Sequence, residues 1–151
     1  MRRNLRFAGL SLLILILFSG CRKWINEENR LEGRWRLVAI ERINFLSWRS
    51  VQNDYREGLF TFFNNGAAVY DEDPVQMNGS WHMRKHRAGY YDNDGEWRTD
   101  QRIDFDLELY DFSENRVLKL YFDQLIFRGR DRFLAEYRTP NYRYRYDFRR
   151  D

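Results

Sequence analysis

Alternating hydrophobic and polar positions predict antiparallel β-strands through most of the chain. In the clearest segment, residues 102–112, every second side chain is hydrophobic and carboxylates lie between them. Strict alternation of this kind is typical of a strand with one buried face. The hydrophobic positions of this segment are Ile103, Phe105, Leu107 and Leu109. Residues 113–116 then form a turn, and residues 117–122 alternate again, which together predicts a β-hairpin.

Similar short runs, separated by turn residues, predict the other strands. They lie at residues 33–43, 59–63, 67–70, 79–84, 125–128, 132–138 and 142–149. Residues 64–66, Asn-Asn-Gly, predict a tight turn because Asn and Gly accept positive φ. Residues 44–55 are open to a short helix or a lid-like connection. Many short strands at regular spacing favour a barrel or a sandwich, and closing a barrel would remove exposed sheet edges.

The N-terminus has the layout of a secretory signal peptide. Three arginines within the first six residues precede an uncharged run, residues 7–18, which ends beside the small residues Ser19 and Gly20. A positive start, a short apolar run and small residues at a cut mark a cleaved signal. The run is shorter than the ~20 residues that a membrane-spanning helix needs. We therefore predict a signal peptide at residues 1–20, with a short uncleaved anchor as the alternative.

The end of this segment resembles the lipobox of bacterial lipoproteins. The matching residues are Leu17, Phe18, Ser19, Gly20 and Cys21. The resemblance implies that the chain is cut before Cys21 and that this cysteine carries the lipid. Cys21 is the only cysteine, so an exported chain can form no internal disulfide. Each buried CH₂ of an acyl chain adds about 0.8 kcal/mol to membrane affinity.

The lipobox resemblance also implies a location. Arg22 stands where an Asp often retains lipoproteins in the inner membrane, so we expect the outer membrane, facing either the periplasm or the cell surface. Residues 21–30 would then form the lipidated cysteine and a polar tether. The folded domain is expected at residues 31–151.

Four short motifs of that domain resemble the bacterial lipocalin-like lipoproteins. They are Gly33-Arg34-Trp35, Phe60-Thr61-Phe62, Gly79-Ser80-Trp81 and Tyr144-Arg145-Tyr146. The resemblance extends from Leu31 to the C-terminus and implies an all-β fold, a small antiparallel up-and-down β-barrel of roughly eight to nine strands. It also implies that Trp35 closes one end of the barrel and stacks against Arg145 or Arg149.

A lipocalin-like barrel binds its ligand inside. The side chains expected to face inward as a ligand lining are Phe62, Trp81, Phe105, Leu107, Leu120 and Tyr144. A small barrel either holds one ligand or is filled by its own side chains, and the sequence leaves both open. The two corresponding functions are binding of a small apolar ligand and, as the alternative, a non-catalytic accessory subunit of a cell-envelope complex.

The charge distribution argues against a nucleic-acid partner. The formal charge of the whole chain is +3, and the three arginines of residues 1–20 account for all of it. Nucleic-acid binding depends on a strong positive field. Residues 92–114 are acidic and residues 128–151 are basic. These opposite charges either neutralise each other on the surface of the domain or form charged patches that bind an envelope partner. The basic and aromatic residues 142–146 are assigned to a final strand with its tyrosines inward.

Signals of catalysis or of metal binding are weak. On a strand, His82 and His86 would lie about 13 Å apart, too far to share one metal ion. Residues 92–96 lack the full spacing of a calcium loop and are assigned to a hairpin turn. The serines lie in no nucleophile-elbow context. We therefore predict no enzyme activity, no cofactor and no metal site.

Overall fold

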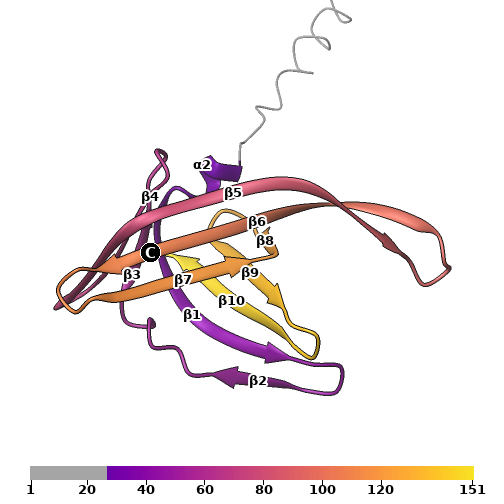
Figure 1. The fold of residues 1–151 in the computed structure, drawn as a ribbon, viewed down its shortest axis with the longest axis horizontal. Coiled ribbons are helices and arrows are strands. Elements are labelled where there is room, and N and C mark those ends of the chain that lie inside the picture. The colour runs from indigo at the N-terminus through magenta and orange to yellow at the C-terminus, as the bar shows by residue number, and fades with distance from the viewer. Residues whose placement is uncertain (1–26) are drawn as a thin grey trace, which may run out of the picture.

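One short helix and ten antiparallel strands make up residues 27–151, the part of the chain that the computed structural model describes (Figure 1). The elements are α2 (Glu27–Leu31), β1 (Gly33–Ile43), β2 (Trp48–Val51), β3 (Leu59–Phe62), β4 (Ala67–Glu72), β5 (Val75–Tyr91), β6 (Trp97–Asp111), β7 (Arg116–Phe122), β8 (Gln124–Phe127), β9 (Arg132–Arg138) and β10 (Arg143–Arg150). The predicted all-β, antiparallel fold is confirmed, with ten strands in place of eight to nine. Cys21 and the predicted signal peptide lie outside the described residues, and the last part of the predicted tether is helix α2.

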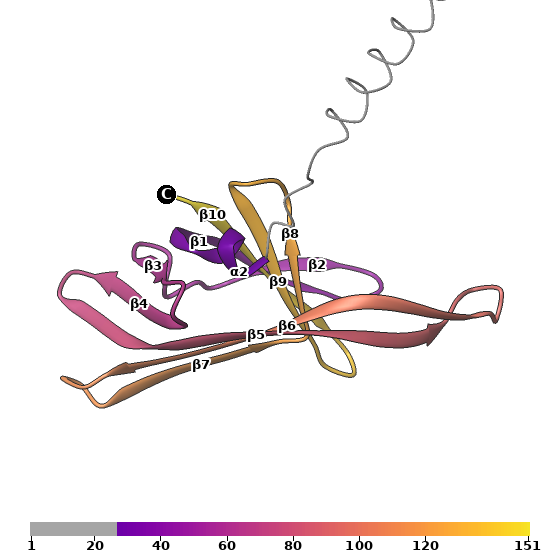
Figure 2. The ribbon, with the colours of Figure 1, turned by 90° about the horizontal axis from the view of Figure 1, so that it is seen from above.

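The strands follow one another in a meander, but the sheet is not closed into a barrel. Its order is β7-β6-β5-β4-β3-β1-β10-β9-β8, and β2 pairs with β1 beside this path. The two edge strands, β7 and β8, are consecutive in sequence and separated by Asp123 alone. One residue is too short for the two-residue turn that a hairpin needs. The chain therefore bends at Asp123, and β8 crosses the direction of β7 (Figure 2).

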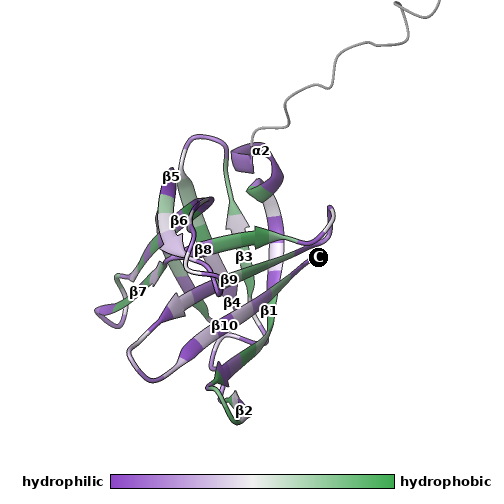
Figure 3. Ribbon diagram, turned by 90° about the vertical axis from the view of Figure 1, so that its right-hand side faces the viewer, coloured by the Kyte–Doolittle hydropathy of each residue, from purple (hydrophilic) through white to green (hydrophobic). Residues whose placement is uncertain are grey.

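The register of β1 sets which side chains enter the core. β1 pairs with β10 at one edge and with β3 at the other, and a bulge at Val38 shifts the β1–β10 register. Trp35, Leu37 and Ile40 point inward and are buried. Figure 3 shows the hydrophobic stretches of β3 and β8 in the middle of the molecule and a hydrophilic turn between β9 and β10.

Strands β5 and β6 are much longer than the sequence predicted. They contain 17 and 15 residues, and their outer halves leave the sheet together as a two-stranded projection (Figures 1 and 2). We call residues 85–102 the arm. Its end is the hairpin turn predicted at residues 92–96, where the Asp92 N–H donates to the Glu96 carbonyl at 2.9 Å.

The segment between β1 and β3 differs from its prediction. A strand, β2, lies where a short helix or lid was expected. The side-chain oxygen of Asn44 accepts hydrogen bonds from the backbone N–H groups of Leu46 (3.0 Å) and Ser47 (2.6 Å). An Asn that bonds to the backbone two and three residues on reverses the chain, so β2 folds back onto β1.

Candidate functional site

The expected ligand-lining side chains mostly pack against one another. Phe62, Trp81, Phe105 and Leu107 are buried in one core cluster. The ring of Phe62 lies 6.3 Å from that of Trp81 and 5.7 Å from that of Phe105. Side chains at these distances are in direct aromatic contact, so they occupy the interior themselves.

The other two predicted residues lie nearer the surface. Leu120 is partly buried and packs against the cluster from outside it. Tyr144 stacks on Tyr137 at 4.7 Å, and Tyr137 in turn contacts Phe122 at 6.4 Å. The structure therefore brings four of the six residues together and leaves two on the flank of the core.

Phe133, which the sequence did not single out, lies at the centre of the aromatic core. Its fully buried ring stacks on Phe148 at 4.5 Å and meets Trp35 edge-on at 4.7 Å. It also contacts Phe105 at 6.4 Å and Phe127 at 6.0 Å. Side chains from β1, β6, β8 and β10 thus converge on one residue of β9.

Trp35 is fully buried, and its cationic partner is Arg150. The guanidinium of Arg150 lies 4.3 Å above the indole ring, so the predicted stacking on Arg145 or Arg149 is wrong. Arg145 instead bonds to Glu136 at 2.8 Å, and Arg149 is exposed. The physical reason is strand alternation: the face of β10 that turns Phe148 inward also carries Arg150. This signal was present in the sequence.

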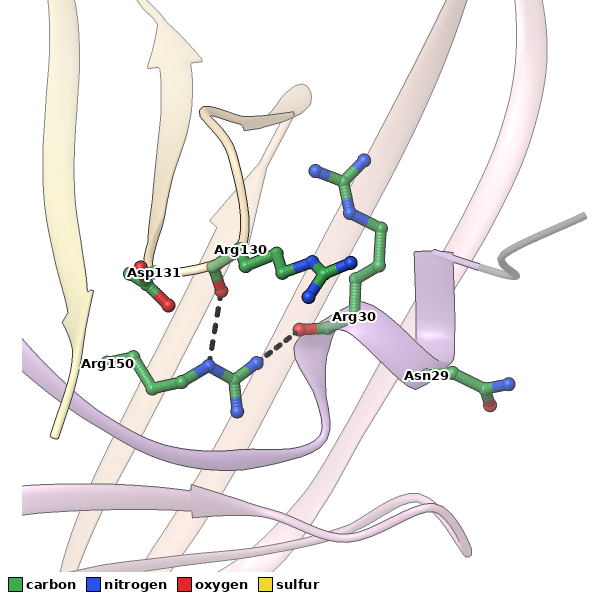
Figure 4. Close-up of a pocket in the computed structure, with 5 residues that line it drawn as sticks. All are labelled: Asn29, Arg30, Arg130, Asp131 and Arg150. Carbon is green, nitrogen blue, oxygen red and sulfur yellow. Dashed lines mark hydrogen bonds between the residues drawn. The ribbon is translucent and has the colours of Figure 1, made fainter.

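Arg150 also fastens helix α2 to the sheet. Its guanidinium donates to the backbone carbonyls of Arg30 (2.9 Å), Glu32 (3.0 Å) and Arg130 (3.2 Å), two of which are drawn in Figure 4. The last carbonyls of a helix lack partners within it, and Arg150 supplies one. A side chain on Gly33 would meet this guanidinium at 2.5 Å, and Gly33 has φ +122°. The Gly-x-Trp motif therefore makes room for the arginine that covers its Trp.

A pocket of about 370 Å³ lies next to this arrangement (Figure 4). Its lining comes from α2, the β8–β9 turn and β10, and consists of Asn29, Arg30, Arg130, Asp131 and Arg150. Arg30 donates to the Gly129 carbonyl at 2.7 Å, and its guanidinium lies 4.4 Å above the ring of Phe127. Two of the three arginines are thus already held by protein atoms.

A larger pocket, of about 590 Å³, lies at the β4–β5 end of the sheet. It is lined by Asp54, Tyr55, Tyr70, Glu72, Val75, Met77, Arg116 and Val117. Burial, followed by a hydrogen bond to Glu72, raises the pKa of the Tyr70 phenol. Burial also raises the pKa of Tyr55. Both phenols stay protonated at neutral pH and are poor bases or nucleophiles. The Tyr70 hydroxyl already donates its proton to Glu72, so Tyr55 is the phenol that can donate to a ligand.

Within residues 27–151 no three metal-binding side chains come together. The carboxylate of Asp92 caps its own turn by accepting from the N–H groups of Asp94 (3.0 Å) and Glu96 (2.9 Å), and it pairs with Arg98 at 2.9 Å. The bond from Arg98, followed by these N–H groups, lowers the pKa of Asp92. The same residues hold a hairpin end together, as the sequence indicated.

Large hydrophobic side chains are exposed at two hairpin ends. Phe45, Leu46 and Trp48 lie at the β1–β2 turn, and Tyr91 and Trp97 lie at the end of the arm. Both ends lie on the right in Figures 1 and 2. The sequence assigned no function to either group. Their only sequence signal is the presence of aromatic residues in segments without an alternating buried face.

The chain matches none of the family models, curated proteins or solved structures with which it was compared. In the part of the chain that is described, no helix has the length and hydrophobicity to cross a membrane.

Proposed function

We propose that this chain is a lipid-anchored, non-catalytic interaction module of the bacterial cell envelope, and that the arm binds a partner protein. The observation that carries the proposal is the arm itself. Beyond the part of the hairpin that packs on the core, which we call the body together with the other strands, the two strands of the arm pair with each other, from His86 opposite Arg102 to Tyr91 opposite Trp97. An isolated two-stranded hairpin is marginal in water, so a partner that covers the arm would stabilise it.

The end of the arm carries exposed aromatic side chains on a rigid turn, which favours binding to another protein. The indole of Trp97 lies over Gly89, where any Cβ atom would collide with the ring, and meets Tyr91 edge-on at 5.0 Å. Arg98 pairs with both Asp92 and Glu96 and so braces the turn. Trp, Tyr and Arg are the residues most enriched among binding hot spots. These rings are held in place and are still largely exposed, which reduces the entropy lost on binding.

The charges of the arm favour a protein as the partner. Its basic residues are Lys85, Arg87, Arg98 and Arg102, and its acidic residues are Asp92, Asp94, Glu96 and Asp100. Four charges of each sign leave no net field for nucleic acid or for an anionic membrane. Mixed charges around exposed rings are typical of the polar rim and aromatic centre of protein interfaces.

The anchor and the location belong to the same proposal. Removal of residues 1–20 and lipid on Cys21 would hold the domain at the outer membrane, in the periplasm or at the surface. The meander order and the pairing of β1 with the last strand support kinship with lipocalin-like lipoproteins. The open edge at β7 and β8 is a departure from the closed barrel of that family.

Site-specific photo-crosslinking in the bacterium that produces the chain tests this function. A photoreactive phenylalanine analogue at Tyr91 or Asp94 is expected to give one discrete protein adduct. The same analogue at Asn65, on an exposed turn of the body, is the matched control and should not give that adduct. Equal adducts from all three positions, or none from the arm, would contradict the proposal.

A second candidate function is binding of a small ligand in the pocket between Tyr55 and Tyr70. The pocket combines hydrophobic side chains with the phenol of Tyr55 as a donor and the phenol oxygen of Tyr70 as an acceptor, and its volume suits a small molecule. Native mass spectrometry on fragment 22–151 purified from a periplasm tests it. A reproducible added mass that is lost on Tyr70→Phe and Met77→Ala would support ligand binding, and a clean apo mass from folded protein would count against it.

A further inference from the structure

Two neighbouring hairpin ends form a second exposed surface, separate from the arm. The β1–β2 and β9–β10 turns lie side by side, and the guanidinium of Arg42 lies 4.8 Å above the ring of Tyr142. A recess of about 440 Å³ between them is lined by residues of both hairpins. We call this surface the tip patch; it consists of Arg42, Phe45, Leu46, Trp48, Arg49, Arg138, Tyr142 and Arg143.

The hydrophobic part of the tip patch projects fully into solvent. The exposed fractions are 101% for Phe45, 88% for Leu46 and 68% for Trp48. Three hydrogen bonds to the Asn44 side-chain oxygen fix this turn, from the N–H groups of Leu46 and Ser47 and from the Ser47 hydroxyl. Three large exposed hydrophobic side chains thus lie at one end of a hairpin whose backbone is fixed. Trp, Phe and Leu on one face are the residues with which peripheral proteins enter the boundary between lipid headgroups and acyl chains.

The charged part of the tip patch has one sign. Residues 42–50 and 137–146 contain five arginines and no acidic residue. The neighbouring carboxylates all have partners. Glu136 is buried and is held by Arg145 at 2.8 Å and Arg143 at 3.7 Å. Glu41 pairs with Arg145 at 3.7 Å, and Asp123 accepts the backbone N–H of Arg138 at 2.7 Å. Among the described residues, the guanidinium groups of Arg49 and Arg138 form no ion pair. Two free cations therefore flank the exposed hydrophobic side chains.

We propose that the tip patch docks on an anionic lipid bilayer. Phe45, Leu46 and Trp48 enter the headgroup region, and Arg49 and Arg138 contact lipid phosphates. Charge decides against a protein partner here, because the arm carries balanced charges around its rings and the tip patch carries arginines alone. A cation near an anionic bilayer is attracted to it, and hydrophobic side chains at the same point add their own transfer free energy.

This contact is independent of a lipid on Cys21 and of the function proposed for the arm. The eleven residues of β1 place the tip patch about 33 Å from helix α2. Docking there would be a second contact with a membrane, and it can be measured on protein that carries no lipid. All the described strands and core residues lie within residues 27–151, and fragment 22–151 contains every one of them.

The experiment measures binding of unlipidated fragment 22–151 to vesicles. One set contains equal parts of phosphatidylglycerol and phosphatidylcholine, and the other contains phosphatidylcholine alone. The fragment is expected to float with the anionic vesicles. Its tryptophan emission should shift to the blue and be quenched by brominated acyl chains. The part of the emission shift and quenching that disappears in Trp48→Phe comes from Trp48 and reports how deeply this side chain enters the bilayer.

Matched variants locate the contact. Arg49→Gln with Arg138→Gln removes two charges and should weaken binding about 30-fold. Arg128→Gln with Arg130→Gln removes the same charge at the opposite end of β9 and should leave binding nearly unchanged. Phe45→Ser with Leu46→Ser should abolish the quenching, whereas Phe112→Ser, at the equally exposed β6–β7 turn, should not affect it.

Three results would overturn the proposal. The first is no binding to anionic vesicles by folded fragment. The second is equal loss of binding in both arginine pairs, which would indicate nonspecific attraction. The third is concentration-dependent dimerisation that Phe45→Ser with Leu46→Ser abolishes in the absence of vesicles, since the hydrophobic side chains would then meet a second copy of the chain.

Discussion

The two halves of the β5–β6 hairpin have opposite properties although they belong to the same pair of strands. In the inner half, Met77, Trp81 and Met83 alternate into the core opposite Phe105 and the leucines of β6. In the outer half, residues 85–102, no side chain is fully buried. The backbone pairing is continuous across both halves. Hydrogen bonding alone therefore does not separate the stable part of the molecule from the part that is free to bind.

The same difference separates the half that stabilises the fold from the half for which we propose a binding function. The inner half is flanked by the paired strands β4 and β7, and one of its faces packs on the aromatic core. Substitutions there should therefore lower the free energy of unfolding. The outer half contacts little besides its own partner strand, so substitutions there should change binding instead.

Phe133→Ala should have the largest effect on stability. The ring is fully buried and contacts rings from four other strands, and deleting a buried Phe side chain typically costs about 3–5 kcal/mol. Chemical denaturation of fragment 22–151 measures the loss. Phe112→Ala, which removes an exposed ring, is the control and should stay within about 0.5 kcal/mol of the parent.

Arg150→Gln should destabilise the helix end of the body by about 2 kcal/mol. The substitution removes three hydrogen bonds to backbone carbonyls and the contact of the guanidinium with Trp35. Because Arg150 is exposed, water can replace some of these hydrogen bonds, which limits the loss. Arg149→Gln, one residue away and on the other face of β10, should have almost no effect. Equal losses in the two variants would show that the contact with Trp35 contributes nothing specific.

Acid should weaken the β6–β7 turn through Asp111. Its carboxylate accepts from the Ser113 hydroxyl (2.6 Å) and from Arg116 (2.8 Å), which lowers its pKa from 3.8 to about 2. A depressed folded-state pKa stabilises the fold above the ordinary value. That stabilisation is lost as the pH falls from 3.8 through about 2. Denaturation midpoints across this range should fall more steeply for the parent than for Asp111→Asn.

Trp97→Ser should have the smallest effect on folding. The side chain is mostly exposed and contacts only the arm in the structure, so the free energy of unfolding should change by less than about 0.5 kcal/mol. The adduct from the photoreactive position 94 should nevertheless be lost. A large loss of stability would mean that the arm contributes to the core, against the division proposed here.

The sequence predicted the strands that bury one face, because alternation at residues 102–112 and 117–122 reports burial directly. It did not predict the arm, because neither face of residues 85–102 is buried and hydrophobic and polar residues therefore do not alternate there. It also did not predict the open sheet edge. That edge depends on the single residue Asp123 between two strands, a detail of chain geometry that hydrophobicity does not encode.

Candidate sites were predicted less well than strands. Trp35 is fully buried beneath the guanidinium of Arg150. Alternation along β10 is consistent with Arg150 as its partner, whereas the family resemblance implied Arg145 or Arg149. Hydrophobic side chains such as Phe62 and Phe105 look the same in sequence whether they fill a core or line a cavity. Only their mutual distances distinguish the two cases.

The most direct test of the account removes the arm. His86 and Arg102 are cross-strand partners, so an Asn-Gly turn can replace the residues between them and close the hairpin. We expect the free energy of unfolding of this variant to lie within about 0.5 kcal/mol of that of the parent. In the cell, a photoreactive group at Lys85 of this variant should no longer give the partner adduct that is seen from the arm. An unfolded variant, or an undiminished adduct from Lys85, would contradict this expectation.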